Sequence, residues 1–351
     1  MGRLRSATYL RELDAVVNAN IPWDALADKT VTLSGATGMI GAFLIDVLMR
    51  KNAQDGLGCR VVALGRSFGK ARARLPYLDS PLFSFEEMDV SERGATPSGR
   101  ADYVLHLASS THPRAYASSP IETIAANTDG LKNLLEYASS CGARLLFASS
   151  VEVYGENRGD VERFCEDYCG YIDCNTLRAC YTESKRLGEA MCQAYRTQRG
   201  VEAVIARIAR VYGPTLLADD SKALSQFIHR ALAGKDVVLK SAGTQRYSYL
   251  HVADAVGGLL HVLLNGEDGE AYNLADPASD TSLRDLASLV ADVAGVQVTF
   301  DTPDAQEAVG YSKATLALMD GSKAHALGWT PCFTLNQGVA ETLSILKEMG
   351  T

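Results

Sequence analysis

A glycine-rich turn between a predicted strand and a predicted helix is the feature that most constrains the fold. Residues 29–34 are mainly β-branched and apolar, which is typical of a buried strand, and residues 39–49 place apolar side chains at helical spacing. Gly35, Gly38 and Gly41 stand between them. Such a junction offers backbone N–H groups and the positive end of a helix to a pyrophosphate. We therefore expect a dinucleotide to bind here.

Each glycine has its own role in this interpretation. Gly35 permits the tight turn, Gly38 lets the backbone approach the phosphates, and Gly41 lets the helix pack on the strand. A tight turn that binds nothing can show the same spacing, so residues further along the chain have to support the interpretation. The expected cofactor cradle comprises Gly35, Thr37, Gly38, Met39, Ile40 and Gly41.

The residues after the second predicted strand bear on the choice of nicotinamide cofactor. An acid at the end of this strand, residues 60–64, would hold the ribose hydroxyls of NAD. Arg66 follows the strand instead, and a guanidinium can pair with the extra phosphate of NADP or simply be solvated. NAD and NADP therefore both stay open. Asp89 and Val90 follow an apolar-rich run and either reach the adenine edge or form an ordinary turn.

Strands and helices alternate through the first two hundred residues. Predicted strands cover residues 104–108, 145–149 and 203–207, and predicted helices cover 121–140 and 179–199. Such alternation is typical of a parallel sheet with crossover helices. The sequence therefore predicts an α/β fold with a Rossmann-type doubly wound parallel sheet.

The alternation loosens in the C-terminal part of the chain. Residues 221–234 and 282–294 favour helices, and residues 237–240 and 296–300 favour short strands. We expect a smaller α/β subdomain that covers the carboxyl ends of the sheet strands, where open α/β sheets bind ligands. The expected division is a helical extension over 1–28, a dinucleotide-binding domain over 29–208 and a substrate-binding subdomain over 209–351, with a partial return to the first domain around 245–265.

Charge and hydropathy limit the partners of the chain. Its 351 residues carry a net charge of -8, whereas nucleic acids require basic surfaces, so we expect no nucleic-acid partner. No stretch approaches the roughly 18 uninterrupted apolar residues of a membrane helix. The first 20 residues are charged where a signal peptide would be apolar. We therefore expect a cytoplasmic protein that does not bind membranes.

The eight cysteines do not match a metal site. Cys165, Cys169, Cys174 and Cys180 cluster, but the gaps between them of three, four and five residues differ from the paired Cys-xx-Cys of zinc sites. We expect reduced thiols, several of them in the core, and no metal.

Tyr181 and Lys185 are the strongest candidates for catalysis. They are four residues apart in a predicted helix, so both side chains project from one face. The ammonium can lower the pKa of the phenol, which is ordinarily about 10, and can also hold the nicotinamide ribose. Such a pair also occurs by chance on helices. Combined with the upstream glycine turn, it indicates a nicotinamide-dependent oxidoreductase.

Two further candidates stand at the end of the predicted strand 145–149. Ser150 is well placed to hydrogen-bond the hydroxyl that is oxidised, although a serine here can also cap a turn. Glu152 can act as a second acid or base, orient a sugar, or be a solvated loop charge.

These motifs resemble those of the extended short-chain dehydrogenase/reductases, in the nucleotide-sugar epimerase and dehydratase family. The resemblance runs from residue 29 to the C-terminus and includes the glycine turn, His-Leu-Ala at 106–108, Asn127 in Asn-Thr-Asp-Gly-Leu-Lys-Asn-Leu, the segment 150–155, Tyr181 with Lys185, and Tyr-Gly-Pro at 212–214. It implies a nucleotide-diphosphate sugar as substrate and a homodimer formed by the helices near Asn127 and Tyr181. It also adds Leu107, Ala108, Ser109, Asn127 and Lys185 to the cofactor site.

Segments 166–170 and 178–186 are most similar to those of UDP-glucuronate decarboxylases. The similarity implies that Tyr181 removes the proton of the sugar C4 hydroxyl while hydride passes to the bound nicotinamide. The resulting β-keto acid then loses carbon dioxide before the hydride returns. Glu152 matches the active-site glutamate of that group, and Ser150 matches its hydroxyl partner.

The chain departs from the family pattern at three positions. Val151 replaces the aspartate that protonates the leaving hydroxyl in dehydratases, so dehydration is disfavoured. Arg210 stands where relatives have a neutral residue, and Tyr247 stands where they have a pyrophosphate-binding arginine. Either Arg246 or Arg210 then supplies the missing positive charge, and we favour Arg210. Lys222 is a further expected substrate contact.

Three functions remain open at this point. The first is a nucleotide-sugar enzyme that oxidises C4 transiently, with decarboxylation ahead, and Glu152 favours it. The second is a 4-epimerase or an NADPH-dependent reductase on the same scaffold, and Arg66 favours a reductase. The third is a non-catalytic dinucleotide-binding sensor, which would be expected to lose Tyr181 and Lys185.

Overall fold

A central parallel sheet of seven strands organises the computed structural model, which describes residues 2–301 and 314–350. In chain order the strands are β1 (Thr30–Ser34), β2 (Arg60–Gly65), β3 (Phe83–Glu87), β4 (Tyr103–His106), β5 (Arg144–Ser150), β6 (Ala203–Ile208) and β10 (Ala271–Leu274). The helices associated with this sheet are α2 (Met39–Asp55), α3 (Phe68–Arg74), α4 (Pro113–Ser118), α5 (Pro120–Cys141), α6 (Ala179–Arg199) and α8 (Val252–Asn265).

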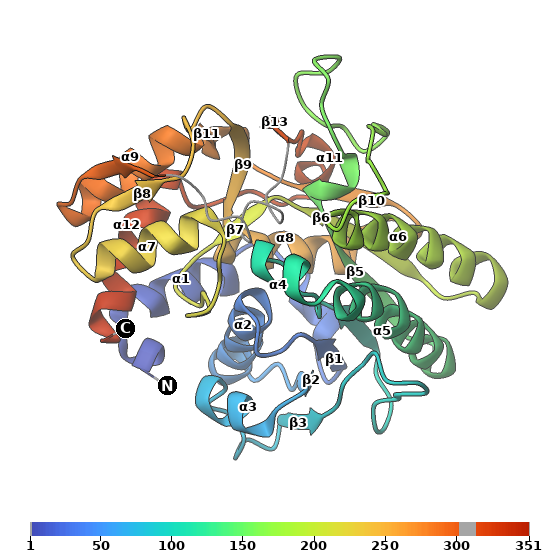
Figure 1. Cartoon of the computed structure of the whole chain (residues 1–351). Coiled ribbons are helices and arrows are strands. Elements are labelled where there is room, and N and C mark those ends of the chain that lie inside the picture. The colour runs from blue at the N-terminus through green and yellow to red at the C-terminus, as the bar shows by residue number, and fades with distance from the viewer. Residues whose placement is uncertain (1, 302–313, 351) are drawn as a thin grey trace.

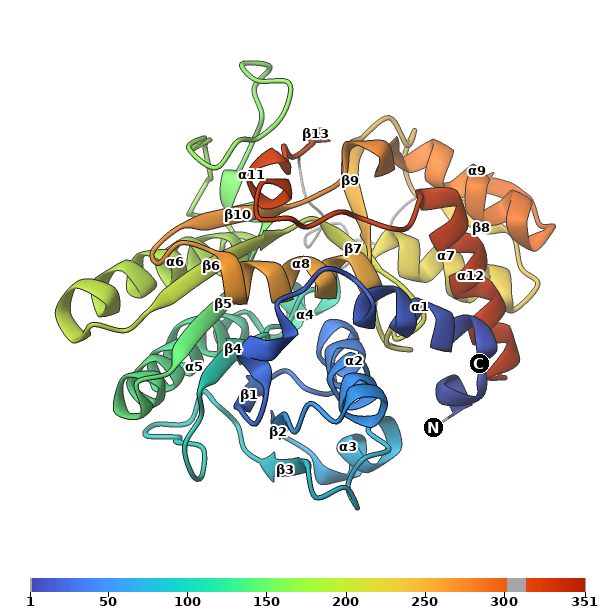
Figure 2. The same cartoon turned by 180° about the vertical axis from the view of Figure 1, so that it is seen from behind.

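The strand order is β10-β6-β5-β4-β1-β2-β3, and every neighbouring pair is parallel. The order reverses between β1 and β4, where doubly wound sheets bind ligands beyond the carboxyl ends of the strands. Helices α5 and α6 cover one face of the sheet, and α2 and α8 cover the other (Figures 1 and 2). The predicted Rossmann-type fold is confirmed.

Most predicted elements of this sheet agree with the structure, but two boundaries differ. The strand expected over 104–108 ends at His106, because the N–H of Ala108 is bonded to the Ser34 hydroxyl (3.2 Å) instead of to a neighbouring strand. The helix expected over 39–49 continues to Asp55 and ends where Gly56 adopts the left-handed conformation.

The C-terminal part of the chain forms two smaller sheets. Strands β7 (Arg210–Tyr212), β9 (Arg246–His251), β11 (Asp280–Ser282) and β13 (Leu316–Ala317) form one, and β8 (Val237–Leu239) and β12 (Val298–Phe300) form the other. Among the described residues, α7 (Ala223–Leu232), α9 (Leu283–Ala294) and α12 (Leu335–Glu348) accompany them, whereas α11 (Ser322–His325) packs on β10 and α8. Helices α7 and α9 pack on each other and on β8, and their apolar side chains belong to the same continuous core as those of the main sheet.

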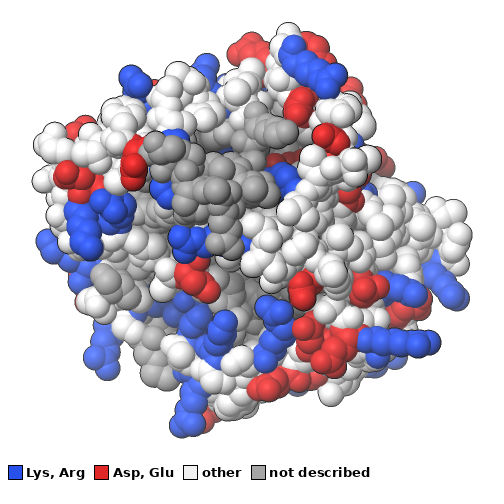
Figure 3. Space-filling model, viewed as in Figure 1, with Lys and Arg blue, Asp and Glu red and all other residues white. Residues whose placement is uncertain are grey.

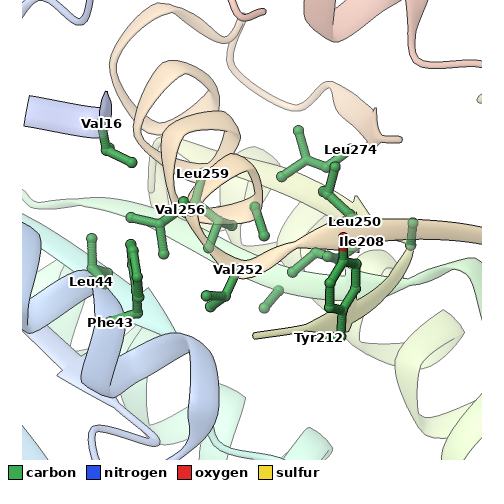
Figure 4. Packing of buried hydrophobic residues seen from close by; sticks show 14 of the residues in the cluster. Val16, Phe43, Leu44, Ile208, Tyr212, Leu250, Val252, Val256, Leu259 and Leu274 are labelled. Carbon is green, nitrogen blue, oxygen red and sulfur yellow. The ribbon is translucent and has the colours of Figure 1, made fainter. Parts of the chain in front are cut away.

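The chain returns to the main sheet through α8 and β10. Helix α8 is buried along almost its whole length and packs against α2, β5 and β6. Strand β10 then pairs with β6 and becomes the edge strand. Figure 4 shows the apolar side chains at this junction, from α1, α2, α8 and neighbouring strands: Val16, Phe43, Leu44, Ile208, Tyr212, Leu250, Val252, Val256, Leu259 and Leu274. The return thus spans residues 252–274, and β9 before it belongs to the smaller sheet.

The surface is mixed in charge, and the cysteines are free thiols. Acidic and basic side chains are interspersed over the described part of the face in Figure 3.

In the described ranges no helix has the length and apolarity to cross a membrane, and no three potential ligands group as a metal site. Four cysteines are buried and four are exposed, including Cys165, Cys169 and Cys174 of the cluster noted in the sequence.

An N-terminal helix, α1 (Ala7–Val17), fastens the two parts of the molecule together. It packs on α2 and α8 and also on α12. Before it, the buried guanidinium of Arg3 pairs with Asp46 of α2 at 2.6 Å, and the Tyr9 hydroxyl donates to the same carboxylate at 2.5 Å. A buried charge requires such a partner, so these contacts fix where the extension lies.

Helix α1 also buries Glu12 against His251 at the end of β9. His251 Nδ1 accepts the N–H of Ala253, so the proton of the neutral ring lies on Nε2, which is 3.5 Å from Glu12 Oε1. Burial raises the pKa of Glu12 to about 9, and the carboxylates of Glu341 and Asp254 contribute. Burial lowers the pKa of His251 to about 3. At neutral pH both groups are therefore uncharged.

Glu12→Gln should make the protein less sensitive to alkaline pH. Between the ordinary pKa of 4.5 and the folded pKa of about 9, the unfolded chain loses a proton that the folded protein keeps. Stability attributable to Glu12 is therefore present below pH 4.5 and falls by up to about 1.4 kcal/mol per pH unit as pH rises through this window. Urea unfolding from pH 5 to 8 should show a growing stability advantage of the variant. Parallel stability curves for the two proteins would contradict the assignment.

Candidate active site

A cavity of about 360 Å³ lies at the carboxyl ends of the main-sheet strands. Its lining combines the glycine turn after β1, the ends of β5 and β6, the start of α6 and residues of the C-terminal part. The predicted cofactor cradle and the predicted substrate region therefore meet in one cavity. This is where an open α/β sheet is expected to bind its ligands.

The glycine turn has the shape that its sequence predicts. Gly35 has a φ of 72°, and a Cβ atom added to it would lie 2.7 Å from the carbonyl carbon of Leu107. A Cβ on Gly41 would lie 2.3 Å from the carbonyl oxygen of Gly35, so any larger residue would separate α2 from the turn. Gly38 begins α2 without a side-chain cap. The first N–H groups of the helix are thus left for an anion, which fits the pyrophosphate of a dinucleotide.

The other predicted cofactor residues divide into two groups. Met39, Ile40, Leu107 and Ser109 line the cavity, whereas Thr37, Ala108 and Asn127 do not. Asn127 is fully buried, and its side-chain amide donates to the Ser184 hydroxyl on α6 at 2.9 Å. It therefore contacts the helix that carries Tyr181 and Lys185, and not the cavity itself.

The three residues expected near the adenosine lie at the sheet edge, away from the cavity. Arg66 follows β2, has a side chain that is 71% exposed, and places Nη1 3.9 Å from Asp89 Oδ2. Asp89 also accepts hydrogen bonds from the N–H and hydroxyl of Ser91. Val90 is buried and packs close to Gly130. Arg66 and Asp89 thus stand beyond the second strand, where the adenosine ribose binds in this fold.

Tyr181 and Lys185 are both buried on one face of α6 and line the cavity. Lys185 Nζ donates to the carbonyl oxygen of Ala148 at 2.7 Å and lies 5.8 Å from the centre of the Tyr181 ring. Burial lowers the pKa of Lys185 to about 7, although Glu189 favours its charged form. The structure therefore places Tyr181 and Lys185 side by side on the helix, as their spacing predicts.

Burial outweighs any lowering of the Tyr181 pKa by the charge of Lys185. Burial raises the pKa of Tyr181 to about 12, while a hydrogen bond with Ser150 and the charges of Arg178 and Arg210 act in the opposite direction. The spacing of Tyr181 and Lys185 predicts that an ammonium lies near the phenol. It does not predict that burial removes water from the phenol and so raises its pKa. The phenol is protonated at neutral pH, so base function requires further positive charge beside it. An oxidised nicotinamide ring carries such a charge.

Ser150 ends β5 and serves two purposes. Its hydroxyl accepts the N–H of Glu152 at 3.3 Å and so caps the short 3-10 helix Val151–Tyr154. The same hydroxyl lies close enough to the Tyr181 phenol to lower its pKa. A hydroxyl can both donate and accept, so the capping role and the expected role beside Tyr181 are compatible.

Glu152 is a largely buried anion held between two arginines, and not a solvated loop charge. Its carboxylate lies 2.8 Å from Arg178 Nη2 and 3.2 Å from Arg210 Nη2. Although burial opposes it, the two guanidinium groups lower the pKa of Glu152. Glu152 therefore stays ionised at neutral pH and is unsuited to storing a proton.

The two arginines also stack on aromatic rings of the cavity wall. Arg178 Cζ lies 4.5 Å from the centre of the Tyr116 ring, and Arg210 Cζ lies 3.9 Å from that of Tyr247. Among the described residues, Arg178 Nε and Nη1 and Arg210 Nε are buried without a hydrogen-bond acceptor. With Glu152 the cluster has two positive charges and one negative charge. An added anion would therefore be stabilised here.

The expected substrate contacts are only partly brought together. Arg210, Lys222 and Tyr247 line the cavity, whereas Arg246 does not and is exposed. Lys222 Nζ lies 3.1 Å from Asp220, and the Tyr247 hydroxyl donates to the Ala314 carbonyl at 2.9 Å. Of the two arginines proposed to replace the missing cation, only Arg210 reaches the cavity.

Sequence reasoning assigned no role to Arg178 or Tyr116. Arg178 lies in a segment noted for its similarity, and its position three residues before Tyr181 at the start of a helix predicts a shared face. This spacing was a usable signal. Tyr116 lies on α4, and its ring centre is 5.0 Å from that of Tyr181. Nothing in its sequence surroundings indicates this contact.

The family model of the NAD dependent epimerase/dehydratase family matches residues 31–275. The chain belongs to this family. It is 33% identical over 324 residues to UDP-glucuronic acid decarboxylase 1 of Xenopus tropicalis, covering 91% of this chain and 72% of the relative. It is 32% identical over 316 residues to UDP-glucuronic acid decarboxylase 3 of Arabidopsis thaliana, covering 88% and 86%. The family expected from the motifs is therefore confirmed.

Solved structures of family members share the fold. A UDP-glucose 4-epimerase of Thermotoga maritima with UDP-glucose superimposes with a TM-score of 0.77 at 21% identity, covering 92% of this chain and 100% of that chain. A UDP-glucuronic acid 4-epimerase of Bacillus cereus, in complex with UDP-glucuronic acid and NAD, gives 0.75 at 21% identity, covering 91% and 99%. At this identity the likeness concerns the fold alone.

Tyr181→Phe should abolish hydride transfer and leave cofactor binding nearly intact. The substitution removes the proton acceptor but keeps the buried ring, and general-base loss typically costs roughly a hundred- to ten-thousand-fold in rate. Single-turnover absorbance of the reduced nicotinamide measures the effect. Tyr195→Phe is a matched control. Tyr195 lies on the same helix as Tyr181, but its hydroxyl donates to Glu136 of α5, away from the cavity. Retained turnover in Tyr181→Phe would rule out this residue as the base.

Proposed function

We propose that the protein decarboxylates a nucleotide-diphosphate uronic acid by transient oxidation of the sugar C4 with bound NAD. The observation that carries this proposal is the cluster of Arg178, Glu152 and Arg210 beside Tyr181. The UDP-glucuronic acid decarboxylases among its relatives support the same reaction class. NAD is the cofactor named in the family description and in complexes of solved neighbours, whereas exposed Arg66 is the feature that favours NADP.

The excess positive charge suits a sugar that carries a carboxylate. A buried N–H group without an acceptor costs free energy, and a carboxylate can accept hydrogen bonds from both guanidinium groups. The sequence alone suggested that Arg210 holds the diphosphate. We assign it instead to the sugar carboxylate, because it contacts Glu152, which lies two residues beyond Ser150. Lys222, also in the cavity lining, is then the candidate for the diphosphate.

The residues of the site account for removal of the C4 proton, and a solvent proton then replaces the lost carboxylate at C5. NAD, when bound at the glycine turn, supplies the acceptor for the C4 hydride. Tyr181 takes the proton of the C4 hydroxyl, and Ser150 and Tyr181 then hydrogen-bond the C4 oxygen of the ketone. The C4 ketone is β to the C6 carboxylate, so cleavage of the C5–C6 bond leaves its electron pair as an enolate. Hydrogen bonds from Tyr181 and Ser150 stabilise the charge that develops on the C4 oxygen.

A nucleotide-uronate 4-epimerase is the second candidate, and the paired arginines favour it. A carboxylate held by two guanidinium groups loses carbon dioxide less readily, because its negative charge must leave both cations. Glu152 counters part of that attraction, which favours decarboxylation. A net reductase would instead consume NADPH, and a binding sensor would have no need of the Tyr181–Lys185 pair.

Mass spectrometry of the products separates these functions. The purified protein is incubated with NAD and with UDP-, dTDP-, GDP- and CDP-linked uronic acids, and with the matching neutral hexoses. Decarboxylation predicts loss of the mass of carbon dioxide from a uronate. An unchanged mass with altered chromatography would establish epimerisation, and a reaction of neutral sugars alone would refute the proposal.

Arg210→Met should reduce kcat/KM for a nucleotide uronate by about 10- to 100-fold, the usual worth of hydrogen bonds to a charged group. A neutral hexose nucleotide should bind nearly as well as before. Lys222→Met is the matched control and should weaken binding of both kinds of sugar. Binding affinity for both kinds of sugar nucleotide is measured by calorimetry. An equal loss of affinity for both in Arg210→Met would instead place this arginine on the diphosphate.

We also propose a homodimer formed through α5 and α6. These adjacent helices expose apolar side chains, with Ile121 76%, Ile124 43% and Leu187 52% accessible (Figure 1). Exposed apolar faces of this kind mark association surfaces, and a two-fold axis would pair them with their own copies.

Ile121→Glu should convert the dimer into a monomer in light scattering after size-exclusion chromatography, because the charge would be buried at the interface. Val293→Glu on α9, where the apolar side chain is also exposed, should leave the dimer intact. A monomeric parent protein would remove the dimer proposal.

A further inference from the structure

Glu189 is largely shielded from solvent on the catalytic helix one turn beyond Lys185, and the reaction described above gives it no role. It forms a two-point ion pair with Arg207 of β6, with Nε–Oε1 at 3.0 Å and Nη2–Oε2 at 2.7 Å. The two side chains are only 13–14% exposed. Ser149 at the end of β5 donates a further hydrogen bond to Glu189 Oε1, at 2.5 Å. The carboxylate thus connects α6 to two strands of the main sheet.

These contacts meet at the backbone that shapes the catalytic site. Ser149 stands between Ala148, whose carbonyl oxygen accepts Lys185 Nζ, and Ser150, whose hydroxyl lies beside Tyr181. In the register of the sheet, Ser149 is opposite Arg207. Any shift of Glu189 would therefore move the carbonyl that holds the ammonium.

The network continues into the segment that precedes α6. Arg207 Nη1 donates to the Tyr154 hydroxyl at 3.0 Å and to the Glu166 carbonyl at 2.7 Å. The Tyr154 hydroxyl in turn donates to Asn273 Oδ1 of β10 at 2.6 Å. Arg207 is therefore anchored independently of Glu189, and the network provides a separate variant that breaks the ion pair.

Among the described residues, Glu189 is the acidic side chain whose charge acts on the Lys185 ammonium and favours its charged form. From α6 the ammonium also meets Tyr181 and the thiol of Cys192, and burial raises the pKa of both. From β4 it meets His106, whose pKa burial lowers to about 3, so the ring is neutral. From β5 it meets the ring of Phe147, at 4.7 Å, and the Ala148 carbonyl.

We propose that Glu189 is a positioning residue that keeps Lys185 charged inside the closed site and fixes the Ala148 carbonyl to which the ammonium is bound. The inference rests on the proposed function in that it takes a charged Lys185 to be needed for holding the cofactor ribose. A neutral amine would lose the charge-assisted hydrogen bonds through which it binds that ribose.

Glu189→Gln tests the inference because it removes the charge with almost no change in shape. At high pH, kcat/KM falls as Lys185 loses its proton. In the variant this fall should begin about one pH unit lower, as expected for loss of a nearby opposite charge. Activity should then fall about tenfold at pH 8 and recover towards that of the parent protein at pH 6. Binding of NAD or NADP alone should show the same shift, which tests the inference without any sugar and independently of the sugar assignment.

Arg207→Gln is the matched control. It breaks the same ion pair and should lower the melting temperature to a similar extent, but it leaves the Glu189 charge, so the fall of kcat/KM at high pH should not move down. Glu189→Asp provides a second comparison if the glutamine variant does not fold, and its fall of kcat/KM should move less in the same direction. If kcat/KM of Glu189→Gln falls at the same high pH as that of the parent protein, the role of Glu189 is merely structural and the proposal is overturned. An equal loss of activity at all pH values in Glu189→Gln and Arg207→Gln would overturn it as well.

Discussion

The partly buried cluster of Arg178, Glu152 and Arg210 is the interaction on which the rest of the site depends. Removing charges from water is costly, and one carboxylate does not satisfy two guanidinium groups. The ring stacking of both arginines holds them in place, so the excess charge stays beside Tyr181. Under the proposed function, this charge selects a ligand that brings its own negative charge close to the group being oxidised.

The fold assembles this cluster from separate parts of the chain. Glu152 follows β5 of the main sheet, Arg178 precedes α6, and Arg210 begins β7 of the smaller sheet. The return of the chain through α8 and β10 fixes the two parts relative to each other, and α1 packs on α8, α2 and α12 at the same junction (Figure 2). Stability of the junction and the geometry of the site are thus coupled.

Local patterns in the sequence predicted the sheet, the glycine turn and the shared helix face of Tyr181 and Lys185. They could not predict effects of tertiary burial, such as the raised pKa of the Tyr181 phenol or the ion pair between Glu189 and Arg207. The choice between Arg246 and Arg210 shows the same limit. Adjacent residues in a strand point to opposite faces, so Tyr247 on β9 faces the cavity and Arg246 faces away, but only the pairing of β7 with β9 reveals this.

Conversion of UDP-glucuronate that carries deuterium at C4 tests the central claim most directly. If the cofactor takes the C4 hydride and returns it to the same carbon, the product should be lighter by carbon dioxide and should retain the deuterium at C4. A product of unchanged mass, or one whose deuterium has passed to released cofactor, would contradict a redox-neutral decarboxylation.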